Sequence, residues 1–121
     1  MRTLILALSL TSLSLSAQPL VKATESKAIN WLSIEEAEAK AKKVPKPLMV
    51  DVYTSWCGPC KMLEANTFSD PRLAEYVNSH FYAVKFNAES GTPITFKGQK
   101  LENPEFDAAR VGGRNGTHQL T

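Results

Sequence analysis

The sequence predicts a single small domain of the α/β class. Leu48 to Tyr53 is apolar except for Asp51, and a short run of this kind is typical of a central strand covered on both faces. Helical patterns precede and follow this run, and a second strand-forming segment, Phe81 to Asn87, comes after them. We expect the two strands to lie parallel, because the chain between them is long enough for a right-handed crossover.

The amino-acid composition also indicates the general class of protein. The 121 residues are 43% hydrophobic and 21% charged, which suits one globular domain. The net charge is only +2, with lysines and glutamates interspersed, so nothing indicates binding to nucleic acid or to an anionic membrane surface. Two cysteines, three positions apart, are too few for a disulfide-stabilised scaffold.

Residues 1–17 have the pattern of a secretory signal peptide. Arg2 supplies the basic start, Leu4 to Leu15 is apolar, and Ser16-Ala17 offers small residues for cleavage, although a cut after Ala23 also fits. An uncleaved membrane anchor is the alternative, but the apolar run of about 12 residues is shorter than the roughly 20 that span a bilayer. We therefore expect an exported protein, periplasmic or secreted, with no stable membrane insertion after cleavage.

The predicted domain, residues 28–121, follows a polar linker at residues 18–27. Residues 28–31 are expected to form a short edge strand or a hydrophobic plug. Ser33 and Glu36 have the spacing of a capping box and predict a helix to about Lys43. Two prolines then end this helix and begin the extended segment that leads into the apolar strand.

The two cysteines lie where the apolar strand gives way to the next helix. Pro59 fits only the first turn of a helix, which places Cys57 at the N-cap and Cys60 one turn further on. The Cys60 amide is then the natural donor to the Cys57 sulfur. Because a helix N-terminus favours thiolate over thiol, Cys57 is the candidate nucleophile, and Cys60 is within reach to form a disulfide with it.

Two other interpretations of the cysteine pair stay open. A purely structural disulfide would close a four-residue loop, which stabilises a fold by only roughly 2 kcal/mol. A copper- or zinc-binding module is the second, although structural zinc usually needs four ligands and only His80 and His118 remain as further candidates. Both histidines are expected at the surface, and we expect no metal in the site.

Asp51 is unusual because a carboxylate within an apolar strand is costly unless it is paired or hydrogen-bonded. It could simply pair with a lysine of the neighbouring strand. It could also act as a proton acceptor buried behind the dithiol, six residues before Cys57. Burial would raise its pKa, as a base for a thiol near neutral pH requires, and the two roles are compatible.

The strand that contains Asp51, the short turn and the run Trp56-Cys57-Gly58-Pro59-Cys60-Lys61 resemble the active-site region of the thioredoxin family. With the signal peptide, the chain looks most like the exported thioredoxin-like proteins of the bacterial cell envelope. The resemblance implies a thioredoxin-like sheet with flanking helices. It also implies exchange of thiols with protein disulfides or dithiols, without a bound cofactor, and an electron-donor partner that the sequence does not identify.

The resemblance also implies roles for individual residues. Cys57 would attack the substrate disulfide, Cys60 would resolve the mixed disulfide, and Asp51 would relay the proton, with Lys85 as its partner from the neighbouring strand. The substrate would contact the surface formed by Trp56, Gly58 and Pro59. The Gly-Pro pair between the cysteines resembles reductants more than strong oxidants, so the direction is expected to be reductive.

The second half of the chain contains weaker signals. The active-site helix should run to about Asn66, with Leu63 in the core, and Asp70-Pro71 should begin a helix that ends near Ser79. Further on, we expect a short strand at residues 94–96 and a brief helix from Asn103 to about Arg110.

The thioredoxin fold ordinarily ends with an antiparallel strand pair, a cis-proline and a helix. The sequence contains no convincing counterpart of these elements. Either the fold is atypical or the sequence is a fragment, and we expect a fragment that lacks the last strands, with activity reduced accordingly. An inert fragment is a further alternative to an enzyme.

Overall fold

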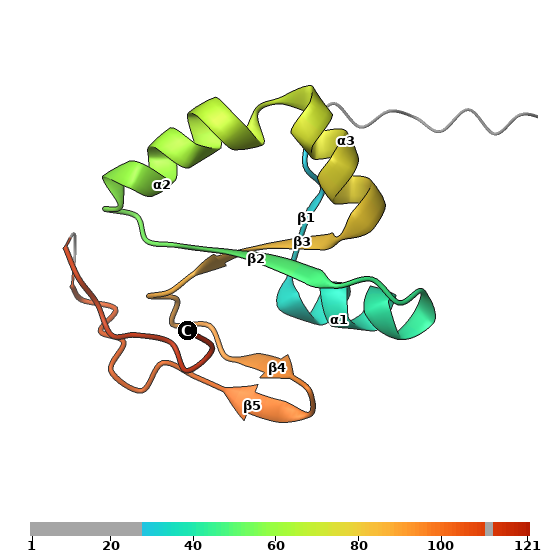
Figure 1. Ribbon diagram of the computed structural model, residues 1–121. Helices are drawn as coiled ribbons and strands as arrows, with labels where there is room; N and C mark the ends of the chain where they lie inside the picture. Colours follow the sequence, from blue (N-terminus) through green and yellow to red (C-terminus); the bar gives the residue numbers. More distant parts are fainter. Residues whose placement is uncertain (1–27, 111–112) are drawn as a thin grey trace, which may run out of the picture.

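A computed structural model describes residues 28–110 and 113–121 (Figure 1). The predicted signal peptide, residues 1–17, and the predicted linker, residues 18–27, lie outside the described residues. Within the described ranges, no helix is both long enough and apolar enough to cross a membrane.

Three parallel strands form the central sheet, in the order β1-β3-β2. They are β1 (Trp31–Leu32), β2 (Leu48–Tyr53) and β3 (Tyr82–Asn87). A separate antiparallel pair consists of β4 (Ile94–Phe96) and β5 (Gln99–Leu101). The predicted α/β class, the parallel pairing and the strand at residues 94–96 are thereby confirmed.

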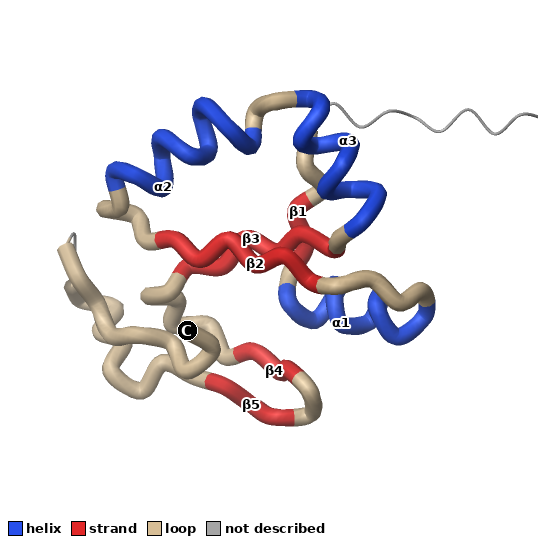
Figure 2. The backbone as a smooth tube through the Cα atoms, viewed as in Figure 1, coloured by secondary structure: helices blue, strands red, loops and turns tan. Residues whose placement is uncertain are grey.

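The helices cover both faces of the sheet (Figure 1). One face holds α2 (Gly58–Leu63), the π-helix η1 (Glu64–Phe68) that continues it, and α3 (Pro71–His80). The other face holds α1 (Ile34–Lys43) and the β4–β5 hairpin. Figure 2 shows that the chain beyond β5 contains only loops and turns where it is described.

The helix starts follow from local hydrogen bonds that the sequence predicts. The Glu36 amide donates to the Ser33 hydroxyl, and the Ser33 amide donates to the Glu36 carboxylate, which completes the capping box of α1. The Asp70 carboxylate accepts from the Arg72 amide and caps α3, with Pro71 as its first residue.

The position of β2 in the sheet differs from the prediction. Among the described strands β3 is the central one and β2 lies at an edge, with β3 as its single neighbour. Its side chains at Val50 and Val52 are 39% and 46% exposed, so the strand is not covered on both faces there. An apolar run indicates which strand has the potential to be buried, but it does not determine the order of the strands.

Two hydrophobic clusters lie on opposite faces of the sheet. One is formed by α1, β3 and β4, with Leu48 of β2 packed against it. The other joins β3 to α3 and is closed by Trp31 and Phe68, whose rings meet edge to face at 5.2 Å. Phe68, and not Leu63, provides the core contact of the α2–η1 helix, because Leu63 is 41% exposed and the prediction for it was wrong.

The β4–β5 hairpin was only half predicted. Its two-residue turn consists of Lys97 and Gly98, with φ of 50° and 76°. Two consecutive residues at positive φ are what tight hairpin turns require, and glycine adopts this conformation readily while lysine does so rarely. Because lysine is not typical of the first position of such a turn, the sequence pattern does not indicate the hairpin.

Residues 102–110 and 113–121, here called the C-terminal segment, are ordered by side-chain hydrogen bonds. The predicted helix at Asn103 does not form, because the buried Asn103 amide instead donates to the Gly116 carbonyl at 2.7 Å. The prediction for His118 was also wrong, since its side chain is only 1% exposed. Its ring accepts from the Leu120 amide at Nδ1, faces the Thr92 carbonyl through Nε2 and packs edge to face on Phe86.

We expect Gly116→Ala to lower the free energy of unfolding by about 2 kcal/mol, because an added methyl overpacks this segment. A Cβ at Gly116 would lie 2.5 Å from the backbone carbonyl carbon of Glu105 and 2.5 Å from Asn103 Oδ1. Urea unfolding of both proteins measures the change. Gly58→Ala is the matched control, since its Cβ meets no atom within 4 Å. Equal stability of Gly116→Ala and the wild type would contradict the packing described here.

Candidate active site

Cys57 and Cys60 are joined by a disulfide at the start of α2, with their Cα atoms 5.4 Å apart. Cys57 is the N-cap, and its sulfur accepts a hydrogen bond from the Cys60 amide at 3.2 Å. Pro59 lies in the first turn and has no amide hydrogen to offer, so the Cys60 amide is the donor beyond it that binds Cys57. The predicted cap is therefore confirmed, and its hydrogen bond would equally favour a thiolate at Cys57.

The connection from β2 to α2 is short and fixed by the backbone. The Cys57 amide donates to the Thr54 carbonyl at 3.2 Å, which closes a turn between strand and helix. Gly58 and Pro59 are exposed, while both cysteines are half-buried. The disulfide thus lies at the surface with one side open to a partner molecule and the other against the protein.

A small cavity of about 100 Å3, lined by residues with polar side chains, lies on the protein side of the disulfide. Its lining comes from β2 and the turn after it, from α2 and η1, and from β3: Asp51, Tyr53, Thr54, Ser55, Cys60, Lys61, Glu64 and Lys85. The Thr54 hydroxyl is buried and has no hydrogen-bond partner in the described part of the chain. A cavity with this volume and lining can admit water, which would connect its polar groups.

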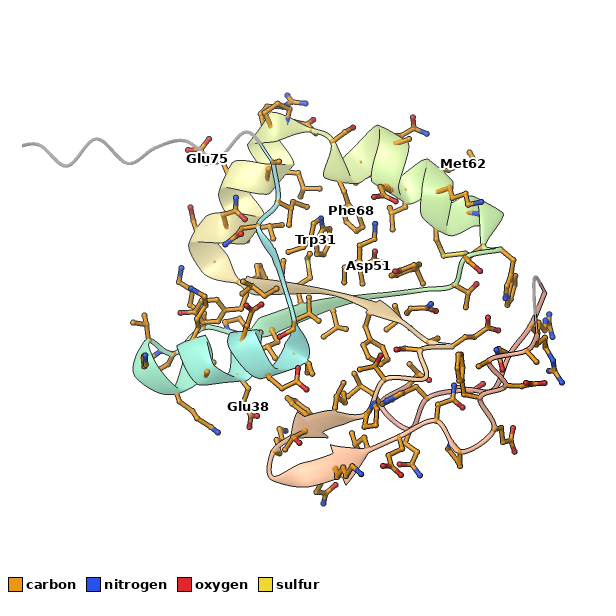
Figure 3. All side chains as sticks on the ribbon, turned by 180° about the vertical axis from the view of Figure 1, so that it is seen from behind. Trp31, Glu38, Asp51, Met62, Phe68 and Glu75 are labelled. Carbon is orange, nitrogen blue, oxygen red and sulfur yellow. A yellow bond between two sulfur atoms is a disulfide. The ribbon has the colours of Figure 1, made fainter. Side chains whose placement is uncertain are left out.

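Asp51 lies between β2 and the α2–η1 helix, on the same side of the sheet as Trp31 and Phe68 (Figure 3). Burial raises the pKa of its carboxyl above the ordinary value of 3.8, the positive charge of Lys85 opposes this shift, and the negative charge of Glu64 adds to it. A raised pKa is what a proton acceptor for a thiol requires. The structure therefore brings Asp51 and Cys60 to one cavity, as the sequence suggested.

Lys85 is the register partner of Asp51 on the neighbouring strand. Its ammonium, however, makes its ion pair with Glu64 at 2.5 Å and lies 5.2 Å from the centre of the Tyr53 ring. The predicted pairing with Asp51 is thus replaced by a longer-range interaction, in which the Lys85 charge lowers the pKa of Asp51 from across the cavity.

Glu64 was missed by the sequence reasoning. It is one helical turn beyond Cys60, and residues four apart lie on the same face of a helix, so the spacing alone could have identified it. Its carboxylate lines the same cavity as Asp51 and holds the Lys85 ammonium. Asp51 is therefore not a single acid behind the disulfide, because it shares the cavity with a second carboxylate and with the ammonium that this carboxylate binds.

We expect Glu64→Gln to lower the pKa of Asp51, for two reasons that act in the same direction. The substitution removes a negative charge that raises this pKa, and it frees the Lys85 ammonium to stabilise ionised Asp51. Carboxyl carbon NMR measures the titration directly. Glu75→Gln, an exposed carboxylate on α3, is the matched control and should leave Asp51 unchanged. A pKa of Asp51 that rises or stays constant in Glu64→Gln would rule out this coupling.

Trp56 stands outside the cavity, directly before Cys57, and its side chain is 46% exposed. Its indole N–H donates to both carboxylate oxygens of Glu89, each at 3.1 Å. The guanidinium of Arg114 lies over the ring, 5.1 Å from its centre. Neither neighbour was predicted, because both come from parts of the chain remote from the cysteine motif.

Among the described residues no group of three or more His, Cys, Asp or Glu side chains is arranged to hold a metal ion. His80 stacks on Tyr76 at the end of α3, and His118 is buried beside Phe86. The two cysteines are bonded to each other in this structure.

Comparison with known protein families matches residues 11–96 to Thioredox_DsbH, described as a protein of unknown function (DUF255). That range contains β1 to β4 and the whole cysteine motif. No solved structure matches the chain.

Among curated proteins, similar chains are thiol:disulfide interchange proteins DsbD. The protein of Escherichia coli K12 is 42% identical over 106 residues, which cover 74% of this chain and 18% of that protein. The protein of Vibrio vulnificus is 37% identical over 57 residues, and that of Pectobacterium atrosepticum is 34% identical over 58. The chain spans less than a fifth of the length of these relatives.

Proposed function

This chain belongs to the thioredoxin-like family that the DsbH model describes, and because similar curated proteins are thiol:disulfide interchange proteins, we propose that it reduces protein disulfides through Cys57 and Cys60. The observation that carries the proposal is the disulfide at the start of α2, with Cys57 on the helix N-cap and Cys60 against the cavity. Each sulfur then has a different environment, as a nucleophile and a resolving thiol require.

The reaction starts from the dithiol form. The Cys57 thiolate attacks one sulfur of a substrate disulfide, a mixed disulfide forms, and the other substrate sulfur leaves as a thiolate. Cys60 then transfers its proton towards Asp51, and its thiolate attacks the Cys57 sulfur. The second substrate sulfur leaves, the substrate has gained two electrons, and the enzyme holds the Cys57–Cys60 disulfide that this structure contains.

The cavity supports the second step. Asp51 and Cys60 both line it, and a carboxylate with a raised pKa can take the thiol proton directly or through water. Glu64 and Lys85 set the charge around Asp51. In this proposal Trp56, Gly58 and Pro59 provide the outer surface that meets the substrate, since all three are exposed beside the disulfide.

The direction of electron transfer, the electron-donor partner and the cellular compartment are further parts of the proposal. The Gly58-Pro59 pair supports a reductive direction, because it resembles the dipeptide between the two cysteines of reductants. Turnover then requires a separate dithiol donor to reduce Cys57–Cys60 again, and interchange proteins among the relatives agree with such a relay. The pattern of residues 1–17 supports export of the domain at residues 28–121, into a compartment where disulfides persist.

Redox titration of the full chain tests the proposal. In a series of dithiol and disulfide buffers, alkylation and mass spectrometry should show a reversible two-electron transition confined to Cys57 and Cys60. The reduced protein should also transfer these electrons to a protein disulfide. Tight stoichiometric binding of copper or zinc by the reduced protein, without electron transfer to a disulfide, would replace the proposal with a metal-binding module.

A further inference from the structure

The indole of Trp56 is held from two sides by residues outside the cysteine motif. Glu89 binds its N–H edge through both carboxylate oxygens, and Arg114 covers one face of the ring. An exposed tryptophan without such contacts would sample several rotamers. Here a carboxylate and a guanidinium fix one orientation beside the dithiol.

Each of these two residues is itself placed by local hydrogen bonds. Glu89 is the second residue after β3, and its amide donates to the Asn87 side chain at 3.0 Å. In the C-terminal segment, Asp107 and Asn115 exchange hydrogen bonds of 2.9 Å beside Arg114. The Arg110 guanidinium donates to the Arg114 carbonyl at 3.1 Å. The backbone that presents Arg114 to Trp56 is thus fixed by its own segment.

The charges around the indole are not equivalent. The Glu89 carboxylate is directed at the indole N–H. Arg114 is exposed and forms no ion pair within residues 28–110 and 113–121. The N–H donors of a guanidinium lie in its own plane, so a guanidinium over an aromatic ring can still bind a carboxylate from another molecule. The side of the dithiol next to Trp56 therefore presents an available positive charge.

We propose that Arg114 is a specificity-determining residue that favours protein disulfides flanked by aspartate or glutamate. The inference rests on the proposed reduction of protein disulfides. Trp56 is exposed directly before Cys57, so a carboxylate next to a substrate cysteine that approaches along the indole can form a charge-assisted pair with Arg114. Glu89 is the positioning residue, because it orients the indole on which Arg114 lies.

Three matched peptides test the role of Arg114. Each contains one cysteine in a mixed disulfide with a chromophoric thiol, flanked by glutamates, by glutamines or by lysines. With the full reduced chain, the second-order rate constant should fall in that order, and the acidic peptide should react about fivefold faster than the neutral one, as one partly exposed charge pair permits. Arg114→Gln should abolish this preference, so that the rate constant no longer depends on the charge of the flanking residues, and Arg114→Glu should reverse it.

Lys42→Gln is the matched control, since it removes the same charge from the exposed side of α1 and should retain the preference. A preference that survives Arg114→Gln, or an equal loss of rate for all three peptides, would overturn the proposed role. Failure of the wild type to reduce any peptide would instead overturn the proposed function, so the two failures are distinguishable.

The role of Glu89 has a separate spectroscopic test. Glu89→Gln keeps an acceptor for the indole N–H and should preserve both the Trp56 fluorescence and the preference for the acidic peptide. Glu89→Ala removes the acceptor, so it should change the difference in fluorescence between oxidised and reduced protein and weaken the preference. Unchanged fluorescence and unchanged preference in Glu89→Ala would show that Glu89 does not position the indole.

Discussion

Cys57→Ser should lower the rate constant for reduction of a protein disulfide by more than about 1,000-fold, because loss of a nucleophile in other enzymes costs more than this. A serine hydroxyl at the same N-cap would still accept the hydrogen bond of the Cys60 amide, so the helix start should remain intact. The loss would therefore report chemistry rather than folding. Stopped-flow measurement with the neutral peptide disulfide gives the rate directly.

Cys60→Ser is the informative counterpart. It should retain the attack by Cys57 but not the resolution, so the mixed disulfide between Cys57 and the peptide should accumulate and be visible by mass spectrometry. Circular dichroism of both variants checks that the secondary structure is unchanged. Accumulation of a mixed disulfide in Cys57→Ser, and none in Cys60→Ser, would exchange the roles of the two cysteines.

The features that the sequence predicted correctly are those set by short-range hydrogen bonds. The Ser33–Glu36 box, the Asp70-Pro71 start and the Cys57 cap each depend on residues within one helical turn, and all three form as expected. The family match and the α/β arrangement likewise confirm the thioredoxin-like fold class. The cysteine motif identifies that class because its residues are contiguous in the sequence.

The features that the sequence did not predict depend on contacts between distant segments. Asn103 has the pattern of a helix cap, yet its amide binds the carbonyl of Gly116, 13 residues away. His118 looks like a surface residue in a polar stretch, yet it packs on Phe86 of β3. No local pattern reveals either contact. The first forms within the C-terminal segment, and the second forms where this segment folds back on β3 and the loop after it.

In the candidate site, too, the features set by neighbouring residues were predicted and those set by contacts between distant segments were not. Cys57 and Cys60 follow from the motif, whereas the ion pair of Lys85 with Glu64 and the contacts of Trp56 with Glu89 and Arg114 join separate elements. The chemistry of the site is thus encoded locally. Its electrostatic surroundings and its outer surface come from η1, β3, the loop after β3 and the C-terminal segment.

Asp51→Asn should slow thiol–disulfide exchange by about 10-fold to 100-fold, near the low end of what general acid–base catalysis contributes. The amide cannot take the Cys60 proton, so the resolving step should be the one that slows. Only ionised Asp51 accepts a proton, so the wild-type rate should fall as the pH drops through its raised pKa, and this limb should be absent in the variant. Rates measured across pH with the neutral peptide give both results.

The same substitution should raise stability at neutral pH. Because the folded pKa of Asp51 is above its ordinary value of 3.8, folding favours the protonated form, and the wild type loses stability as the pH rises from 3.8 through the folded pKa. The neutral amide of the variant has no such loss, so the advantage of Asp51→Asn in urea unfolding should grow over this window and then stay constant.

Glu75→Gln removes an exposed carboxylate of α3 and should alter neither the rate profile nor the stability curve. A pH–rate profile identical in Asp51→Asn and the wild type, together with unfolding curves that do not diverge, would exclude Asp51 from proton transfer and leave the cavity as a structural feature.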